Sequence, residues 1–280
     1  GFERELSKLV LDVALPALVV SSVFGATKLP GAGELLQVFF GMMAFFVLAF
    51  IVACALCAVM RVPKTSLSSF RFIIMFGNCG FIGFPVITAI LGKRALLYAT
   101  IGLIPSNLFI FTLGIMMFRG MDGGWKAVCR GLLDCLKMPT LIASFIVIVC
   151  MATGFTNWGF VGDSIELVGQ MTTPSALLLM GASIAHHQPL SMLTNWRAYV
   201  AAAGRLVLVP LAGMVMLRVL RIAPGIVAVL VLESAMPVAS NGTLYAIQYG
   251  ADTKPMMQGT FISIVASILT IPFVMVFAGA

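Results

Sequence analysis

Long apolar stretches recur along the whole chain and constrain its fold more than any other feature. A helix needs about 20 mainly apolar residues to cross the hydrocarbon layer of a bilayer. Of the 280 residues, 61% are hydrophobic and 10% are charged, against roughly 25% charged residues in soluble domains. A water-soluble fold of this size has no interior large enough for so much apolar surface. The sequence therefore predicts an all-α integral membrane protein.

Charged residues and Gly or Pro separate these stretches into nine predicted spans. The spans are 5–25, 33–60, 66–92, 94–118, 137–156, 164–186, 197–221, 226–250 and 255–278. The only sizeable connection is an interfacial linker over 119–136. Its Trp125, Val128 and Leu132 suggest a short amphipathic helix lying on the membrane, and a plain polar loop is the alternative.

Lysine and arginine predict the orientation, because cytoplasmic loops carry an excess of them. Eleven lie on the side that holds the N-terminus of the first span: Arg4, Lys8, Arg61, Lys64, Arg71, Arg119, Lys126, Arg130, Lys137, Arg197 and Lys254. Five lie on the other side: Lys28, Lys93, Arg94, Arg218 and Arg221. We therefore expect a multi-pass protein of the cytoplasmic (inner) membrane, with the 119–137 loop in the cytoplasm and the C-terminus outside.

Several other classes of protein are excluded by the pattern of residues. The net charge of +7 is spread singly or in pairs between apolar spans, without the aromatic-interleaved basic patch that binds nucleic acid. Cys54 and Cys57 have CxxC spacing, but no second Cys or His pair accompanies them, so they are interpreted as small apolar residues rather than a zinc site. No HExxH, GxSxG or paired acidic motif occurs in a span, which argues against an enzyme. No cofactor is expected beyond a coupling ion.

The two halves of the chain carry a similar order of features. A shift of 158 residues superposes identical residues, among them Leu9 and Val10 with Leu167 and Val168, Pro16 with Pro174, Ala44 with Ala202, Leu48 with Leu206 and Gly92 with Gly250. In both halves a span with a proline is followed by a smooth span, a broken span and a second smooth span. Such internal repeats are typical of transporters.

This repeat has two consequences. The span at 137–156 has no partner in the first half, so the intact unit is expected to have ten helices, with a first repeat over 1–118 that lacks its first helix and a second repeat over 137–280. Because five helices are an odd number, the second half must enter the membrane from the opposite face. The repeats are therefore predicted to be inverted.

Clusters of Gly, Asn and Pro interrupt the third and eighth spans at matching depth. The first cluster is Gly77 to Pro85 and the second is Glu233 to Gly242. Proline removes a backbone donor and clashes with the preceding turn, and glycine relaxes the backbone, so both helices are expected to break and to cross. Irregular backbone is tolerated at this depth only when it is buried in protein or lines a cavity. The alternative is that these residues merely kink tightly packed helices.

Ionisable residues inside spans are costly and are candidates for function. Glu233, just before the second break, is predicted to bind Na⁺ or to carry a proton. Arg205 pairs with Glu233, binds substrate or extends to the cytoplasmic headgroups. Asp12 is either a polar neighbour of Lys8 or a participant. His186 and His187 are interpreted either as interfacial residues or as a proton relay. Asn107 either reaches the crossing point or links neighbouring helices.

The segments GNCGFIGFPVITAILG at 77–92 and SAMPVASNGTLYAIQYGAD at 234–252, with Asn107 between them, resemble the auxin efflux carrier family over essentially the whole chain. More remotely, the chain is similar to the bile acid:sodium symporters. The resemblance implies an inverted repeat of ten helices with two crossing broken helices. It also implies elevator-like movement of a transport domain (33–118 and 197–278) against a scaffold (1–27 and 137–186), and transport of organic anions such as malonate, malate or auxin.

Residues matching these motifs form the predicted site. Those expected to bind the substrate are Asn78, Cys79, Gly80, Pro85, Asn107, Pro237, Ser240 and Asn241. Those expected to bind a coupling ion, Na⁺ or H⁺, are Glu233, Met236 and Gly77, and the resemblance to the symporters supports the first two. The half-helix N-termini present unpaired donors that suit a carboxylate. The prediction is a secondary transporter of a small organic anion, with an anion channel or uniporter as the alternative, and with a homodimer forming through the scaffold helices.

Overall fold

The computed structural model describes residues 2–26, 29–119, 133, 136–185 and 192–278. Within these residues the regular structure is helical, and one isolated β-bridge is the only strand-like pairing. The predicted all-α class is confirmed. His186 and His187 lie outside the described residues, as does the 119–136 linker apart from Arg119, Leu133 and Leu136.

The helices follow the predicted spans, with shifts of a few residues at their ends. The first half contains α1 (Phe2–Leu9), η1 (Val10–Ala14), α2 (Leu15–Ser21), α3 (Ala32–Val59), η2 (Lys64–Ser66), α4 (Leu67–Met75), η3 (Cys79–Gly83), α5 (Phe84–Leu91), α6 (Lys93–Phe109), η4 (Ile110–Gly114) and α7 (Ile115–Arg119). The second contains α9 (Pro139–Thr153), α10 (Gly159–Gln170), α11 (Thr172–Ala185), α13 (Trp196–Ala203), η6 (Gly204–Leu208), α14 (Val209–Val219), α15 (Pro224–Ser234), α16 (Asn241–Gln248) and α17 (Thr253–Ala278). The inverted relation between the halves stays a prediction.

One predicted span differs from the structure. The sequence predicts a single helix over 164–186, whereas the structure has two, α10 and α11, which are separated by a turn at Met171. Pro174 lies in the first turn of α11, where the missing N–H costs nothing. A proline at this position cannot continue the hydrogen-bond ladder of α10, which explains why the helix starts anew.

Three of the π-helical segments in the described residues, η1, η3 and η6, come directly before a proline at the start of the next helix. These prolines are Pro16, Pro85 and Pro210. Proline leaves the carbonyl four residues earlier without its helical donor, and a local widening of the helix is one way to accommodate this. The widening changes the direction of the side chains in that turn, and one of them is Arg205 in η6.

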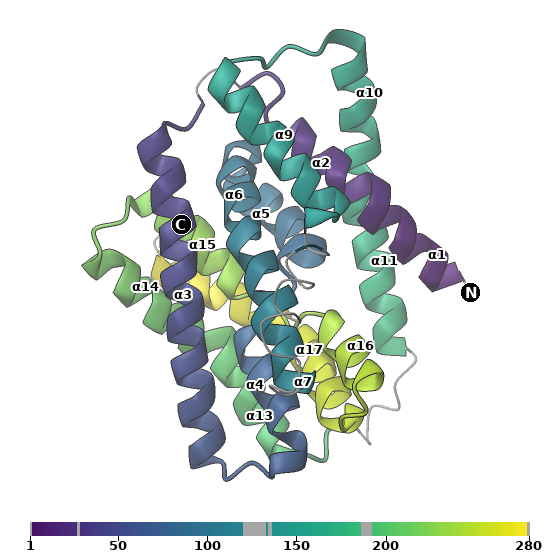
Figure 1. The fold of residues 1–280 in the computed structure, drawn as a ribbon, viewed down its shortest axis with the longest axis vertical. Helices are drawn as coiled ribbons and strands as arrows, with labels where there is room; N and C mark the ends of the chain where they lie inside the picture. Colours follow the sequence, from purple (N-terminus) through teal and green to yellow (C-terminus); the bar gives the residue numbers. More distant parts are fainter. Residues whose placement is uncertain (1, 27–28, 120–132, 134–135, 186–191, 279–280) are drawn as a thin grey trace.

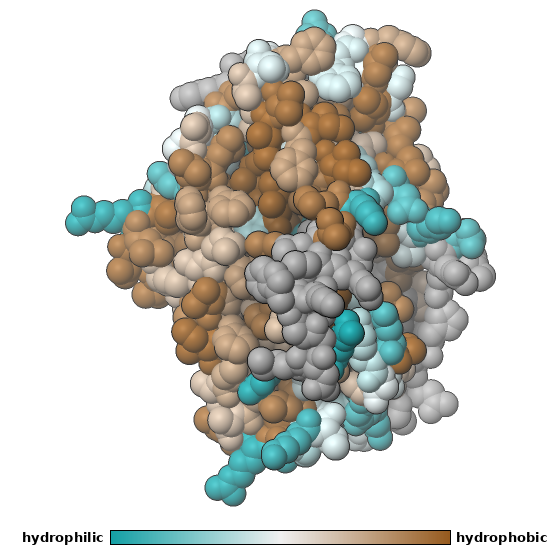
Figure 2. Space-filling view, viewed as in Figure 1, coloured by the Kyte–Doolittle hydropathy of each residue, from teal (hydrophilic) through white to brown (hydrophobic). Residues whose placement is uncertain are grey.

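Lipid is the solvent for most of the outer surface. Four helical segments, 32–59, 93–119, 196–219 and 253–278, are long and apolar enough to cross a membrane within the described residues. Phe40, Ile51 and Val59 on α3 are 63%, 59% and 79% exposed. Apolar residues cover much of the face in Figure 2, and hydrophilic ones project mainly from its margins. Such an apolar exterior is unfavourable in water and is expected in a bilayer.

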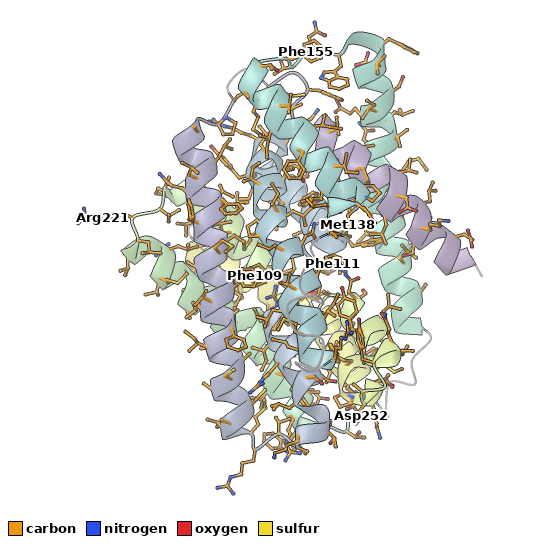
Figure 3. The ribbon with its side chains drawn as sticks, in the orientation of Figure 1. Phe109, Phe111, Met138, Phe155, Arg221 and Asp252 are labelled. Carbon is orange, nitrogen blue, oxygen red and sulfur yellow. The ribbon has the colours of Figure 1, made fainter. Side chains whose placement is uncertain are left out.

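The helices form two groups that pack against each other (Figure 1). One group contains α1, α2, α9, α10 and α11. Gly169 lets α10 approach α2 closely, because a Cβ there would lie 2.8 Å from the backbone of Leu18. The second group contains α3 to α7 and α13 to α17, and both broken helices belong to it. Figure 3 labels Phe155 at one end of the molecule and Asp252 near the opposite end.

Candidate functional site

Both interrupted helices occur where the sequence predicts them. The first stops at Met75 and resumes at Cys79, and the second stops at Ser234 and resumes at Asn241. Phe76 has the extended backbone angles φ −110° and ψ 119°, so the chain leaves the helical conformation completely at the first break. Each break therefore exposes the C-terminal end of one half-helix and the N-terminal end of the next.

The two breaks pair with each other through their backbones. The N–H of Asn78 donates to the carbonyl of Pro237 at 2.7 Å, and the N–H of Ala239 donates to the carbonyl of Phe76 at 3.1 Å. These bonds flank an antiparallel bridge between residues 77 and 238. An unpaired backbone group costs several kcal/mol in a membrane interior, and this pairing removes much of that cost. The broken helices thus meet, as predicted.

Arg205 joins the C-terminal ends of the two first half-helices. Its Nη1 donates to the carbonyl of Met75 at 2.9 Å, and its Nε donates to the carbonyl of Met236 at 3.1 Å. The side chain is 2% exposed. Because helix C-termini carry partial negative charge, one guanidinium offsets two helix dipoles here and also satisfies two freed carbonyls.

This position decides among the alternatives for Arg205. A side chain that is 2% exposed and bonded to both breaks does not extend to the headgroups. It also forms no ion pair with Glu233 within the described residues. Gly77 makes room for it, since a Cβ at this position would overlap the guanidinium. Gly77 therefore permits a close approach between the first break and Arg205.

The N-terminal ends of the second half-helices keep free donors. The side chain of Asn78 accepts the N–H of Phe81 at 3.1 Å and so caps η3. At these two ends, the backbone N–H groups of Cys79, Gly80, Ser240 and Asn241 have no hydrogen-bond partner within the described residues. Ser240 is exposed and Gly80 is partly exposed, so part of this donor set is accessible. These four residues are among those predicted to bind substrate.

Glu233 lies in the last turn of α15 and is completely buried. Neither carboxyl oxygen has a hydrogen-bond partner within the described residues. Gly102 of α6 creates the space, because a Cβ there would overlap Oε2 of Glu233. The backbone carbonyl of Glu233 accepts the thiol of Cys79 at 3.5 Å. A buried carboxyl without a partner is costly and is expected to serve as a binding site for a cation or proton.

The remaining candidates have no side-chain hydrogen bond to the paired breaks within the described residues. Asn107 is buried, and its Nδ2 has no partner within the described residues. Pro85 is buried at the start of α5. Asp12 is exposed on η1, and the structure gives it neither a hydrogen bond nor an ion pair in the described part of the chain.

Sequence reasoning missed two contributors to the crossing. Ser263 of α17 accepts the N–H of Val238 at 3.0 Å and thereby supports the second break. Gly102 opens the space beside Glu233. In the sequence, each of these two is simply a small residue within an apolar span. Such residues are too common to mark a functional position. On its other side, the crossing borders the first helix group, since a Cβ on Gly80 would lie 3.3 Å from Leu15 of α2.

Comparison with known proteins agrees with this architecture. The family model described as membrane transport protein matches residues 3–275, nearly the whole chain. The chain belongs to this family. It corresponds to the auxin efflux carrier family that the motifs resemble. The chain is also similar to the uncharacterized transporter MJ1031 of Methanocaldococcus jannaschii, with 24% identity over 282 residues, which cover 95% of this chain and 86% of the relative. Membership in the family makes the chain a membrane transporter.

Proposed function

We propose that the chain is a secondary active transporter of a small organic anion, a mono- or dicarboxylate such as malonate or malate or an auxin-like acid. The observation that carries this proposal is the set of free backbone N–H groups of Cys79, Gly80, Ser240 and Asn241 at two half-helix N-termini. Backbone N–H groups and the positive end of a helix dipole together favour an anion. A carboxylate has two oxygens, so it can accept hydrogen bonds from the N–H groups of both half-helices at once.

Arg205 supports the same conclusion from the other side of the breaks. Because it occupies the carbonyls of Met75 and Met236, these two groups are closed to a ligand, whereas the free N–H donors of the N-terminal ends remain available to one. Its positive charge also raises the electrostatic potential of the crossing, and charges interact more strongly where water is scarce. Asn78 and Asn107 supply further side-chain amides for the substrate in this proposal.

Glu233 carries the coupling ion, Na⁺ or H⁺, in this proposal. Its buried carboxyl has no protein partner in the described residues and lies next to the second break. Met236 and Gly77 complete the predicted ion site. A Na⁺ ion would share these two residues with Arg205, because the carbonyl of Met236 accepts from its Nε and Gly77 packs against its guanidinium.

Movement of the second helix group against the first would give alternating access by an elevator mechanism. The two groups meet where Leu15 approaches Gly80 and where Lys93 of α6 forms an exposed ion pair with Glu166 of α10 at 2.7 Å. Substrate bound at the crossing would travel with the broken helices. A homodimer through α1, α2 and α9 to α11 would hold the first group still.

Uptake into proteoliposomes tests the proposal. Purified protein is reconstituted, and uptake of radiolabelled malate, malonate and indole-3-acetate is measured with and without Na⁺ and pH gradients. The expected result is saturable uptake of at least one acid that an ion gradient drives above equilibrium. Flux that does not saturate, together with unitary currents in planar bilayers, would identify a channel. Saturable uptake that never exceeds equilibrium would identify a uniporter.

The Glu233→Gln variant separates coupling from substrate binding. Glutamine has nearly the same shape but carries no charge and binds no proton near neutral pH. We expect the variant to exchange substrate across the membrane at equilibrium while losing the response to ion gradients. An unchanged response to both gradients would remove Glu233 from the coupling mechanism.

A further inference from the structure

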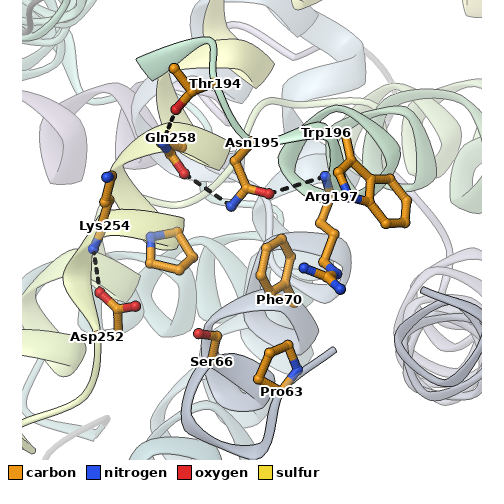
Figure 4. A pocket seen from close by; sticks show the side chains of 11 residues that line it. Pro63, Ser66, Phe70, Thr194, Asn195, Trp196, Arg197, Asp252, Lys254 and Gln258 are labelled. Atoms are coloured by element: carbon orange, nitrogen blue, oxygen red, sulfur yellow. Dashed lines mark hydrogen bonds between the residues drawn. The ribbon is translucent and has the colours of Figure 1, made fainter. Parts of the chain in front are cut away.

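A second polar site lies away from the crossing, where α4, α13 and α17 begin. A cavity of about 340 Å³ lies there, bordered by the loop before η2 and by the turns that precede α13 and α17. Figure 4 shows the side chains that line it. None of the residues predicted to bind substrate or coupling ion lines it. Its volume is in the range of small-ligand pockets.

The guanidinium of Arg197 borders this cavity, and only some of its donors are bonded to the protein. Its Nε donates to the carbonyl of Met60 at 3.1 Å, and its guanidinium carbon lies 5.1 Å from the centroid of the Trp196 ring. These two contacts orient the side chain. Nη1 and Nη2 have no hydrogen-bond partner within the described residues, so their donors are available to a ligand.

The start of α17 adds a second cation and one carboxylate. The backbone N–H of Lys254 donates to Oδ1 of Asp252 at 3.1 Å, so the carboxylate caps this turn. Both side chains line the cavity. With Arg197 the lining carries two positive charges and one negative charge. The net positive charge of this lining favours an anionic ligand.

The unpaired hydroxyl of Ser66 points to a ligand in the cavity. Ser66 occupies the N-cap position of α4, where a serine hydroxyl normally accepts a backbone N–H of the first turn. Here the hydroxyl makes no capping bond and has no other partner within the described residues, although the residue is only 8% exposed and lines the cavity. The hydroxyl faces the cavity and keeps its donor and acceptor capacity for a molecule bound there.

The position of the cavity indicates where such a molecule comes from. The segments 32–59, 196–219 and 253–278 are long enough to cross the membrane, and the cavity lies where the first ends and the other two begin. Trp196, which lines the cavity, and Tyr199, three residues later on α13, are 56% and 42% exposed. Such aromatic residues concentrate at the membrane–water interface. Arg197 and Lys254 belong to the side that is predicted to face the cytoplasm, where anionic lipids attract basic pockets between helices.

We propose that this cavity binds the phosphodiester headgroup of an anionic phospholipid. The Nη groups of Arg197, Nζ of Lys254 and the hydroxyl of Ser66 donate to the phosphate oxygens. Charge-assisted hydrogen bonds of this kind are about twice as strong as neutral ones. The site does not depend on the transported substrate, so it stands or falls separately from the transport proposal.

Lipid-dependent thermal stability tests the site. The purified full chain in a neutral detergent is titrated with phosphatidylglycerol, with phosphatidylcholine, and with inorganic phosphate as a soluble source of the same chemistry. We expect a saturable rise in Tm with phosphatidylglycerol only. The Lys254→Gln variant should need roughly 5- to 10-fold more lipid for the same rise, because it loses one charge-assisted contact. The matched control is Lys64→Gln, which removes an exposed charge near the same end of the molecule but outside the cavity lining.

Ser66→Ala is the second variant, because it changes no charge. It should need about threefold more phosphatidylglycerol, since it loses one hydrogen bond. Equal stabilisation by phosphatidylcholine, equal weakening in the Lys64→Gln and Lys254→Gln variants, or an unchanged lipid requirement in Ser66→Ala would each overturn the assignment. A full rise in Tm with inorganic phosphate alone would contradict the assignment to a lipid headgroup and would identify a site for soluble phosphate.

Discussion

Arg205 donates from its Nε to the carbonyl of Met236 at 3.1 Å, and in doing so it connects a continuous helix to the break in its neighbour. The same guanidinium reaches the break in the other half through Met75. Both contacts are buried within the bundle. One side chain therefore holds the C-terminal ends of two half-helices that are far apart in the sequence.

Removing this side chain should destabilise the protein strongly. Arg205→Ala leaves two buried carbonyls unpaired, each costing about 1 to 3 kcal/mol, so we expect Tm to fall by about 5 °C or more. Arg218→Ala is the matched control, because Arg218 also donates to two carbonyls, those of Phe277 and Ala278, but at an exposed position. Its Tm should change little. Thermal unfolding followed by tryptophan fluorescence measures both, and equal changes would contradict a special role for Arg205.

Gly77 and Arg205 should be energetically coupled. Gly77→Ala places a methyl group where the guanidinium lies and should lower Tm in the wild-type background. In the Arg205→Ala background that space is vacant, so the added methyl should cost little. A double-mutant cycle of Tm values is expected to show a coupling of about 1 kcal/mol or more. Strict additivity would mean that the two residues do not compete for this space.

Asn78→Asp should separate folding from transport. The aspartate can still accept the N–H of Phe81, so the cap and the thermal stability should be retained. Its negative charge would repel an anionic substrate, and we expect uptake to fall by at least about tenfold. The matched control is Asn157→Asp, because Asn157 accepts the N–H of Gly159 at 3.1 Å in an exposed connection. Normal uptake by the Asn78→Asp variant would place the substrate elsewhere.

Gly102→Ala tests the space around Glu233. The added Cβ would overlap Oε2 and would lie 3.3 Å from Cε of Met42, so the carboxyl must move. We expect a weaker response of uptake to the coupling ion, seen as a several-fold higher half-saturating ion concentration. Gly225→Ala is the control in the same helix as Glu233, since a Cβ there meets nothing within 4 Å. It should leave coupling unchanged and raise Tm slightly.

The breaks themselves could be predicted because their cause is local. Asn78 with Gly77 and Gly80 disfavours a continuous helix at the first break. Pro237, three residues before the turn at Ser240, does so at the second. A local cause is readable from neighbouring residues. The pairing of the two breaks followed from their matching depth, which the repeat supplied.

The position of Arg205 could not be predicted with the same information. Its partners are 31 and 130 residues away in the sequence. Its direction depends on a π-helical turn before Pro210, and an apolar span with one arginine is equally compatible with a side chain that extends to the headgroups. The turn at Met171 was missed for a related reason, because Pro174 is compatible with either a kink or a new helix.

The pairing of the two breaks has a consequence for how the chain is made. Cys79 contacts Glu233, which lies 154 positions later in the sequence, and the neighbouring backbone groups find their partners over similar separations. At about 5 to 20 residues per second, a ribosome needs on the order of 8 to 30 s to synthesise that stretch. During this interval the first interruption has entered the bilayer without its counterpart, and its polar groups depend on water or on the insertion machinery. Biogenesis is therefore most vulnerable in this window, and a ribosomal pause within it would be more harmful than a pause after the second interruption has emerged.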